Sequence, residues 1–303
     1  MKVLLTGAAG QLGQALIAAK PPEVQLISTS RTGGGLLEQL DLSDPDACQR
    51  AVQIYRPDWV LNAGAYTAVD QAESEPVVAQ AVNALAPRAL AEALATCCPR
   101  GRLLQLSTDF VFSGQQGCPY RPDQHPDSLS VYGITKAAGE EAVAEILGTG
   151  LDGQAAILRT SWVYGPVGRN FLLTMLMLHR LKAEVQEPLP VVADQVGSPT
   201  ATFGLAKICW SVIASRVSGV LHWSDAGAAT WYDFAQAIGT LAVSRGLIPE
   251  NAEVKPICTL DYPTPAQRPA YSLLDSTTTQ ERLGVTPRHW RAMLDDVLAG
   301  LNA

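Results

Sequence analysis

The sequence predicts an α/β protein: a doubly wound parallel sheet with a smaller α/β lobe attached. Two features of the first 165 residues lead to this fold class. Short apolar runs alternate with longer amphipathic segments, which is the rhythm of repeated strand–helix units. The short runs are apolar at nearly every position instead of every second one. This pattern is typical of parallel strands that helices cover on both faces.

The expected elements of this first part follow one another in a regular order. Each expected strand is a short apolar run bounded by turn residues, and each expected helix has apolar residues at helical spacing. The expected strands are 2–7, 24–29, 57–64, 102–108 and 155–161. The expected helices are 11–19, 45–55, 76–97 and 131–147. Ser43 and Asp44 should open the second helix, and Pro87 should bend the third.

After residue 165 the segments become irregular and prolines become frequent, which predicts a separate smaller lobe. We expect helices at 170–183, 200–215, 230–245 and 288–300. Short strands are expected at 189–192 and 219–223. The chain should therefore divide near residue 165, although later segments are expected to return to the first domain.

Composition narrows the class of function. The 303 residues are 47% hydrophobic and 17% charged with a net charge of −7, which disfavours nucleic acid as a partner. The longest apolar run, at 171–178, is too short to cross a membrane. The six cysteines form no C-x-x-C pair, so we expect no zinc. The N-terminus resembles a strand and not a signal sequence, so a cytoplasmic protein with reduced thiols is expected.

The first candidate site is the segment "TGAAGQLG" (6–13), which places Gly7, Gly10 and Gly13 between a strand and a helix. Glycine allows a sharp turn, a close approach of backbone to a pyrophosphate, and tight packing of helix on sheet. The N–H groups at the helix start favour an anion. The segment predicts dinucleotide binding. The alternative is a tight strand–helix turn whose glycines serve packing alone.

The second candidate site is the end of the second strand, "STSRTGGG" (28–35). A carboxylate that would bind the ribose of NAD is absent here, and Arg31 stands where a 2′-phosphate would lie. With Ser30 as a second donor, this favours NADPH over NADH. The alternative for Arg31 is a solvated loop charge. Asp41 would either contact the adenine end of the cofactor or begin the following helix.

The third candidate site combines "STDFVF" (107–112) with "VYGITK" (131–136). Thr108 and Asp109 end a buried strand, where ligands of open parallel sheets bind; a helix cap or turn is the alternative. Tyr132 and Lys136 are four residues apart and share one face of a helix. A nearby ammonium should lower the pKa of a phenol from about 10. Gly133 would leave room for a ring beside Tyr132.

These residues resemble the extended short-chain dehydrogenase/reductase pattern, and most closely its dTDP-4-dehydrorhamnose reductase family. The segments that carry the resemblance to this family span nearly the whole chain. They are "NAGAYTAVDQAESEP" (62–76), "STDFVFSG" (107–114), "VYGITKAAGE" (131–140), "RTSWVYG" (159–165), "DQVGSPT" (194–200) and "YPTPAQRPAYSLLD" (262–275). The resemblance implies an NADPH-binding Rossmann domain at 1–165 and a mainly substrate-binding lobe at 166–303.

The resemblance also implies an activity. Members of this family reduce the C4 ketone of dTDP-4-dehydro-6-deoxy-L-mannose to dTDP-L-rhamnose, with hydride from the nicotinamide. By carry-over, Tyr132 would deliver the proton, Lys136 would bind the nicotinamide ribose and lower the phenol pKa, and Thr108 would hold the ketone oxygen. NADPH is the expected cofactor, with NADH as a further possibility, and a homodimer is an open expectation.

The family pattern assigns contacts residue by residue. The implied cofactor contacts are Gly7, Gly10, Gln11, Leu12, Gly13, Ser30, Arg31, Asp41, Leu42, Ala63, Gly64, Ala65, Tyr66, Thr67, Tyr132 and Lys136. The implied substrate contacts are Thr108, Asp109, Tyr132, Trp162, Gln195 and Arg268. Three of these have structural alternatives: a strand-end role for Asp109, a core position for Trp162, and an exposed charge for Arg268.

One departure from the family pattern and two rival functions have to be considered. Some family members are Mg²⁺-bridged dimers with a Glu soon after the third glycine, but position 15 is Ala, so we expect no such metal. Sugar-nucleotide 4,6-dehydratases and epimerases share the pattern, but dehydratases have an acid where this chain has Phe110. A non-catalytic NADP-binding regulatory subunit would be expected to have lost Thr108, Tyr132 or Lys136, and all three are present.

Overall fold

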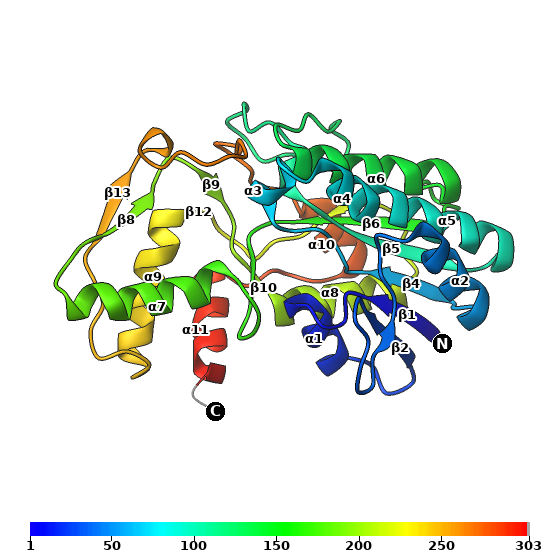
Figure 1. The fold of residues 1–303 in the computed structure, drawn as a ribbon, viewed down its shortest axis with the longest axis horizontal. Helices are drawn as coiled ribbons and strands as arrows, with labels where there is room; N and C mark the ends of the chain where they lie inside the picture. Colours follow the sequence, from blue (N-terminus) through cyan, green and yellow to red (C-terminus); the bar gives the residue numbers. More distant parts are fainter. Residues whose placement is uncertain (302–303) are drawn as a thin grey trace.

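The computed structural model describes residues 1–301 and has two lobes side by side (Figure 1). The larger lobe is built on a seven-stranded sheet in the order β11-β6-β5-β4-β1-β2-β3, and every strand pair in it is parallel. The strands are β1 (Lys2–Thr6), β2 (Gln25–Ser30), β3 (Glu38–Gln39), β4 (Trp59–Asn62), β5 (Arg102–Thr108), β6 (Ala155–Thr160) and β11 (Gly219–His222). The predicted fold class is confirmed.

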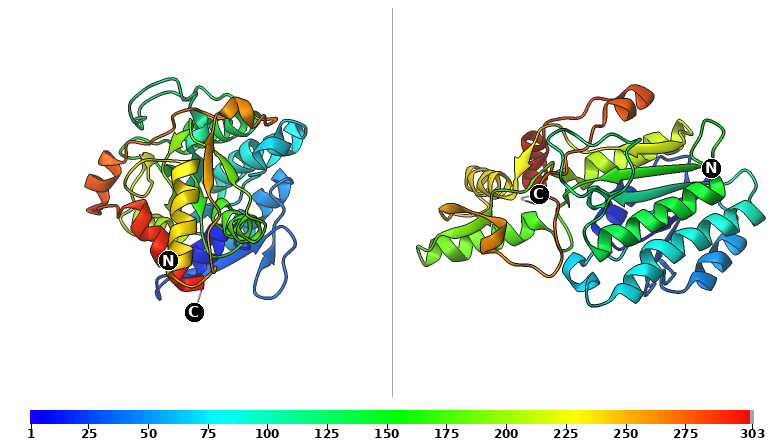
Figure 2. Two further views of the ribbon diagram at one scale, coloured as in Figure 1. Left: turned by 90° about the vertical axis from the view of Figure 1, so that its left-hand side faces the viewer. Right: turned by 90° about the horizontal axis from the view of Figure 1, so that it is seen from above.

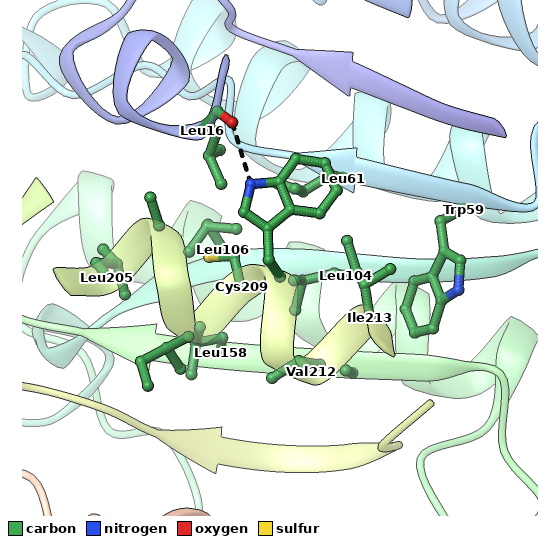
Figure 3. Packing of buried hydrophobic residues seen from close by; sticks show 14 of the residues in the cluster. Leu16, Trp59, Leu61, Leu104, Leu106, Leu158, Leu205, Cys209, Val212 and Ile213 are labelled. Carbon is green, nitrogen blue, oxygen red and sulfur yellow. Dashed lines mark hydrogen bonds between the residues drawn. The ribbon is translucent and has the colours of Figure 1, made fainter. Parts of the chain in front are cut away.

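Helices cover both faces of this sheet (Figures 1 and 2). One face packs against α1 (Gln11–Ala18) and α8 (Thr202–Ala214). Figure 3 shows side chains of α8 against the strands: Leu205, Cys209, Val212 and Ile213 lie near Leu104, Leu106 and Leu158. The Trp210 indole N–H donates to the Leu16 carbonyl at 3.0 Å, which joins the two helices. The other face packs against α2 (Pro45–Tyr55), α5 (Ala86–Cys97) and α6 (Val131–Leu147).

The smaller lobe has its own apolar core, formed by helices and short strand pairs. The helices are α7 (Phe171–Glu184), α9 (Trp231–Ser244) and α11 (Trp290–Leu301). Strand β8 (Leu189–Val192) pairs in parallel with β13 (Val254–Ile257). The two further strand pairs are β7 (Val163–Tyr164) with β10 (Thr200–Ala201), and β9 (Val196–Gly197) with β12 (Ala229–Thr230).

Between these elements the chain returns to the large lobe. Strand β11 forms one edge of the seven-stranded sheet, and α8 covers one of its faces. Helix α10 (Thr277–Leu283) packs against β11. The small lobe therefore consists of three separate stretches of chain. Strand periodicity indicates local structure but does not indicate which layer a later segment joins.

The expected elements and the observed ones agree closely where the patterns are long. Strand 102–108, helix 131–147 and strand 189–192 have the predicted bounds. The expected helix 76–97 instead consists of α4 (Pro76–Gln80), a π-helical segment at Ala81–Leu85 and α5. The irregularity thus precedes Pro87 and takes the form of a wider turn. The short elements α3 (Val69–Ala72), α10 and β13 were not predicted, because segments of this length have too few residues to show a period.

Candidate active site

The glycine turn after β1 is as tight as the sequence predicts. Gly7 has φ +67°, and a Cβ there would lie 2.6 Å from the backbone of Gly64 at the end of β4. A Cβ on Gly13 would lie 2.2 Å from the Gly7 carbonyl oxygen, so this glycine allows α1 to approach the turn. Gly10 caps α1 without a side-chain acceptor. The first N–H groups of α1 therefore have no partner within the helix, as in other anion-binding helix starts.

A cavity of about 650 Å³ lies beyond the carboxyl ends of β1, β2 and β4. It is the position at which open parallel sheets bind ligands. Many residues that the sequence assigned to the cofactor line it. These are Gly7, Ser30, Arg31, Asp41, Leu42, Gly64, Ala65, Tyr66 and Thr67. Its lining also includes Gln71, Glu75, Val78 and Val82, which sequence reasoning did not assign.

Other predicted cofactor residues do not line this cavity. Gly10 and Gly13 shape the turn, and Leu12 and Ala63 pack against the core. The Gln11 side chain donates to the Val163 carbonyl at 3.1 Å and accepts from Asn170 at 3.1 Å. It thereby connects α1 to the segment that leads into the small lobe, so any cofactor contact of Gln11 would come from its backbone.

The end of β2 presents polar groups to the cavity. Arg31 is exposed, and the buried Ser30 hydroxyl accepts from the Gly33 N–H at 3.1 Å. Asp41 accepts from the Ser43 N–H at 2.9 Å and from its hydroxyl at 2.8 Å. Asp44 caps α2 by accepting from the Ala47 N–H at 3.0 Å, so the alternative that Asp41 begins this helix is wrong.

Thr108, Tyr132 and Lys136 lie together where β5 ends beside α6. The Thr108 hydroxyl is hydrogen-bonded to Tyr132, and it contacts Asp109 Oδ1 at 3.2 Å. Ser130 caps α6 by accepting from the Gly133 N–H at 3.3 Å, which places Tyr132 in the first turn. Lys136 is buried, and its Nζ donates to the Leu106 carbonyl of β5 at 2.6 Å. The spacing in the sequence thus corresponds to a real cluster.

Burial dominates the electrostatics of this cluster. It raises the pKa of Tyr132 to about 12, against a lowering by the Thr108 hydrogen bond. It lowers the pKa of Lys136 to about 8, although Glu140 opposes this shift. The sequence led us to expect a phenol pKa below 10, but in this structure burial raises it, and the Asp109 charge adds to the rise. Burial also raises the pKa of the Asp109 carboxyl to about 7.

Gly133 has a structural purpose that differs from the expected one. A Cβ at this position would lie 2.1 Å from the Phe110 carbonyl oxygen. The space beside residue 133 is therefore filled by the segment Asp109–Val111 and does not accommodate a ring of a ligand. The glycine lets the start of α6 approach the end of β5, and this approach brings Tyr132 to Thr108.

Asn83 is a site residue that the sequence reasoning missed. Its Oδ1 accepts from the Tyr66 N–H at 2.9 Å, and its Nδ2 donates to the Tyr66 carbonyl at 3.1 Å and to Thr135 at 3.2 Å. It lies in the π-helical segment and is buried. Asn83 therefore connects the loop after β4 to α6. An Asn within a helical stretch is unfavourable, and this was the available signal.

The acidic segment around α3 connects three parts of the site. Glu73 accepts from the Val131 N–H at the start of α6 at 2.9 Å, and Glu75 accepts from the Tyr66 hydroxyl at 2.7 Å. Asp70 accepts two hydrogen bonds from the Arg268 guanidinium, at 3.0 and 2.8 Å. The structure thus places Arg268 against α3, where the segment after β13 passes over the large lobe (Figure 1).

Trp162 and Gln195 meet through a third residue, Trp231. The rings of Trp162 and Trp231 stack with centroids 3.5 Å apart and an interplanar angle of 6°. The Trp231 indole N–H donates to Gln195 Oε1 at 3.1 Å. Trp162 has φ +45°, a conformation that bulky residues rarely adopt and that often marks functional positions. Trp231 was not predicted, because no local pattern pairs residues 69 positions apart.

Within residues 1–301, no group of three or more His, Cys, Asp or Glu side chains is arranged to hold a metal ion. In that same part of the chain, no helix combines the length and apolar character that crossing a membrane requires.

Comparisons with known proteins relate this chain to one family of reductases over nearly its whole length. The model of the family described as "RmlD substrate binding domain" matches residues 1–303. A dTDP-4-dehydrorhamnose reductase of Streptomyces griseus is 40% identical over 306 residues, which cover 98% of this chain and 93% of the relative. A probable dTDP-4,6-dihydroxy-2-methyloxan-3-one 4-ketoreductase of Streptomyces antibioticus is 38% identical over 305 residues, covering 100% and 96%.

A solved structure agrees in fold and length. It is a dTDP-4-dehydrorhamnose reductase of Bacillus anthracis in complex with NADP, 30% identical, with a TM-score of 0.85 and 99% of both chains covered. Since a family model spans the whole chain and full-length relatives exceed 30% identity, this chain belongs to the dTDP-4-dehydrorhamnose reductase family, whose model is described as the RmlD substrate binding domain.

Proposed function

We propose that this protein catalyses the NADPH-dependent reduction of the C4 ketone of dTDP-4-dehydro-6-deoxy-L-mannose to dTDP-L-rhamnose. The observation that carries the proposal is the cluster of Thr108, Tyr132 and Lys136 at the end of β5. It lies at the same carboxyl edge of the parallel sheet as the glycine turn after β1, with β4 between the two strands, although none of the three residues lines the cavity at that turn. The named relatives and the NADP complex of one of them support the choice of substrate and cofactor.

The residues around the glycine turn fit a nicotinamide dinucleotide. The Cβ positions of Gly7 and Gly13 are already filled by backbone, which is the close packing that a phosphate-binding turn needs. Arg31 and Ser30 would hold the 2′-phosphate, while Leu42 and Asp41 would contact the adenosine end. Ala65, Tyr66 and Thr67 would line the path towards α6. When bound, the cofactor supplies the hydride.

The protonation states of the cluster suit the direction of reduction. With a pKa of about 12, Tyr132 retains its proton at neutral pH and can donate it to the developing alkoxide at C4. With a pKa of about 8, Lys136 is charged at neutral pH and stabilises the phenolate that forms. The Thr108 hydroxyl, hydrogen-bonded to Tyr132, would hold the ketone oxygen and orient it towards the phenol.

We propose that residues of both lobes make the remaining substrate contacts. Asp109 has one carboxylate oxygen, Oδ2, without a hydrogen-bond partner among the described residues, and it would accept from a sugar hydroxyl. Trp162 and Gln195 would contact the substrate from the small lobe, and Arg268 the diphosphate. The division into a cofactor domain at 1–165 and a mainly substrate-binding lobe at 166–303, a homodimer and a cytoplasmic location belong to the same proposal.

A second candidate is reduction of a C4 ketone on a different dTDP sugar. The Streptomyces antibioticus relative, whose name specifies another 4-ketoreduction, is nearly as similar as the dTDP-4-dehydrorhamnose reductase of Streptomyces griseus. The dehydratase rival has less support. Phe110 stands where those enzymes have an acid, and its ring contacts Tyr132 edge to face at 5.7 Å. A phenyl ring has no proton to transfer.

The test is turnover by the purified protein. NADPH absorbance should fall when the 4-keto sugar nucleotide is added, and Tyr132→Phe should reduce kcat about 10²- to 10⁴-fold because it removes the proton donor. NADPH affinity, measured by fluorescence titration, should be retained in that variant. Tight NADPH binding by the wild-type protein with no turnover of dTDP- or UDP-linked 4-keto sugars would refute the proposal and favour the regulatory subunit.

A further inference from the structure

The interior next to the candidate active site contains a buried ion pair, Glu140 with Arg159. Arg159 Nη2 lies 2.6 Å from Glu140 Oε2, and Nε lies 3.0 Å from each carboxylate oxygen. The two side chains are only 4% and 5% exposed. Burying such a pair gains little or no stability over apolar residues of the same size. Its position therefore needs a different explanation.

The pair lies directly behind Lys136. Glu140 follows Lys136 by four residues in α6, so the two side chains are neighbours on one face of the helix. Arg159 on β6 is in register with Ser107 of β5, which directly follows the residue whose carbonyl accepts from Lys136 Nζ. The Glu140 carboxylate thus lies in the same buried layer as two cations.

Apart from Glu140, the groups in contact with Arg159 carry no negative charge. Its guanidinium lies 5.1 Å from the Phe112 ring centroid, and Nη1 is 3.3 Å from His222 Nε2. Burial and the Arg159 charge lower the pKa of His222 to about 3, so this ring is neutral at physiological pH. Glu140 is consequently the carboxylate that offsets Arg159 here.

Other ionisable groups near Lys136 do not replace this charge. On α6 itself Tyr132 is neutral at the pH at which Lys136 loses its charge. Asp109, at the end of β5, is ionised above its pKa of about 7, but Glu140 and not Asp109 is the charge that raises the pKa of Lys136. At the far end of α6, Glu145 pairs with Arg88 of α5 at 3.0 Å. Glu73, beside α3, accepts from the N–H of Val131 at the start of the helix.

We propose that Glu140, fixed by Arg159, is a positioning residue that keeps the Lys136 ammonium charged in the covered interior of the active site. Arg159 orients the carboxylate through two donors, and the carboxylate offsets part of the desolvation of Lys136. The inference rests on the proposed reduction, in which a charged Lys136 stabilises the phenolate of Tyr132. Its consequence is that activity should fall at alkaline pH, where Lys136 loses its charge.

The direction of that dependence follows from the charges. Burial lowers the pKa of Lys136 to about 8, and Glu140 raises it. Activity that needs the charged form is lost as pH rises through this value. Without the carboxylate, the loss should begin at lower pH, by about one unit, because an opposite charge at this spacing shifts a pKa by that order.

The experiment compares pH profiles of kcat/KM for NADPH oxidation. Glu140→Gln keeps the shape and one acceptor for Arg159 but removes the charge. The pH at which kcat/KM begins to fall should be about one unit lower in this variant than in the wild type. At a pH above both limbs, the variant should therefore have a kcat/KM about tenfold lower relative to the wild type than it has at neutral pH. The matched control is Glu145→Gln, which removes an equal charge roughly 7–8 Å further along the helix axis. Its limb should not move.

A second variant covers the case in which Glu140→Gln does not fold. Arg159→Gln removes the cation that fixes the Glu140 carboxylate and keeps it ionised, so the alkaline limb should again move down, by up to about one unit. Circular dichroism checks that each variant folds. If the alkaline limb of every variant that folds coincides with the limb of the wild type, the inference is overturned. That result would leave the proposed function intact, since that depends on turnover by the wild-type protein.

Discussion

At the scale of single residues, the end of β2 decides which cofactor the cavity would accept. Arg31 is exposed at the cavity edge, and Ser30 beside it is buried. No carboxylate stands at the end of β2, where one would bind an unphosphorylated ribose. A guanidinium and a hydroxyl are instead a donor set for phosphate.

Arg31→Ala should therefore weaken NADPH more than NADH. The loss of one charge-assisted contact of about 1.5–3 kcal/mol predicts a KM for NADPH that rises roughly 10- to 100-fold, with little change for NADH. Steady-state kinetics with both cofactors measures this. Arg50→Ala is the control, because Arg50 is an exposed arginine of α2 paired with Asp44. An equal rise for both cofactors would show that Arg31 does not recognise the 2′-phosphate.

Arg268 carries two candidate roles at the residue scale, and they predict different results. The structure pairs it with Asp70, while the family pattern suggests contact with the nucleotide diphosphate. If the pair is structural, Asp70→Ala and Arg268→Ala should destabilise the protein by similar amounts and couple by about 1 kcal/mol in a double-mutant cycle. If Arg268 also binds the diphosphate, its variant should raise the KM for the sugar nucleotide well beyond that of Asp70→Ala.

At the scale of elements, the start of α6 is the part of the site that depends most on close packing. Gly133 faces the Phe110 carbonyl with no room for a Cβ, and Ser130 caps the helix one turn earlier. Gly139 makes a similar approach to the Asn83 carbonyl, where a Cβ would lie 2.1 Å away. Two glycines thus let one helix approach both β5 and the π-helical segment.

Gly133→Ala should push the start of α6 away from β5 and separate Tyr132 from Thr108. We expect kcat to fall by about 10²-fold, since small displacements of catalytic groups have effects of that order. Overpacking should also lower the free energy of unfolding by about 1–3 kcal/mol. Gly150→Ala is the control, because a Cβ there meets nothing within 4 Å. An unchanged kcat in Gly133→Ala would show that α6 is not held in place by this contact.

At the scale of the whole molecule, the two lobes are joined by chain that crosses between them more than once. Asp225, in the segment between β11 and β12, lies at such a crossing and is 3% exposed. Its Oδ2 accepts from the Ala201 N–H at the start of α8, at 2.9 Å. Burial raises the pKa of this carboxyl to about 7.

This shift predicts how stability changes with pH. The folded protein keeps a proton on Asp225 that the unfolded chain releases above about pH 4, so its contribution is lost as pH rises from about 4 to 7. The decline is at most about 1.4 kcal/mol per pH unit. Asp225→Asn removes the titration, so its free energy of unfolding relative to the wild type should rise between pH 5 and pH 7. Denaturant unfolding at several pH values measures it, and parallel curves would contradict the prediction.

Much of the fold could be predicted because its signals are local. The apolar strands, the glycine turn and the helix that begins at Val131 each depend on residues within one turn or one strand of each other. The same is true of the Tyr132–Lys136 spacing. The short elements α3 and β13 were missed because they have almost no local period and form by packing against distant segments.

Sequence alone therefore determined the α/β class, the dinucleotide turn and the identity of the residues at the end of β5, since steric freedom at glycine and hydrophobic period act locally. Tertiary structure decided which distant residues meet: Trp162 with Trp231, Arg268 with Asp70, and Glu140 with Arg159. It also decided the protonation states of Tyr132 and Lys136. These depend on how completely packing removes water from a charged group, and that property exists only once the chain is folded.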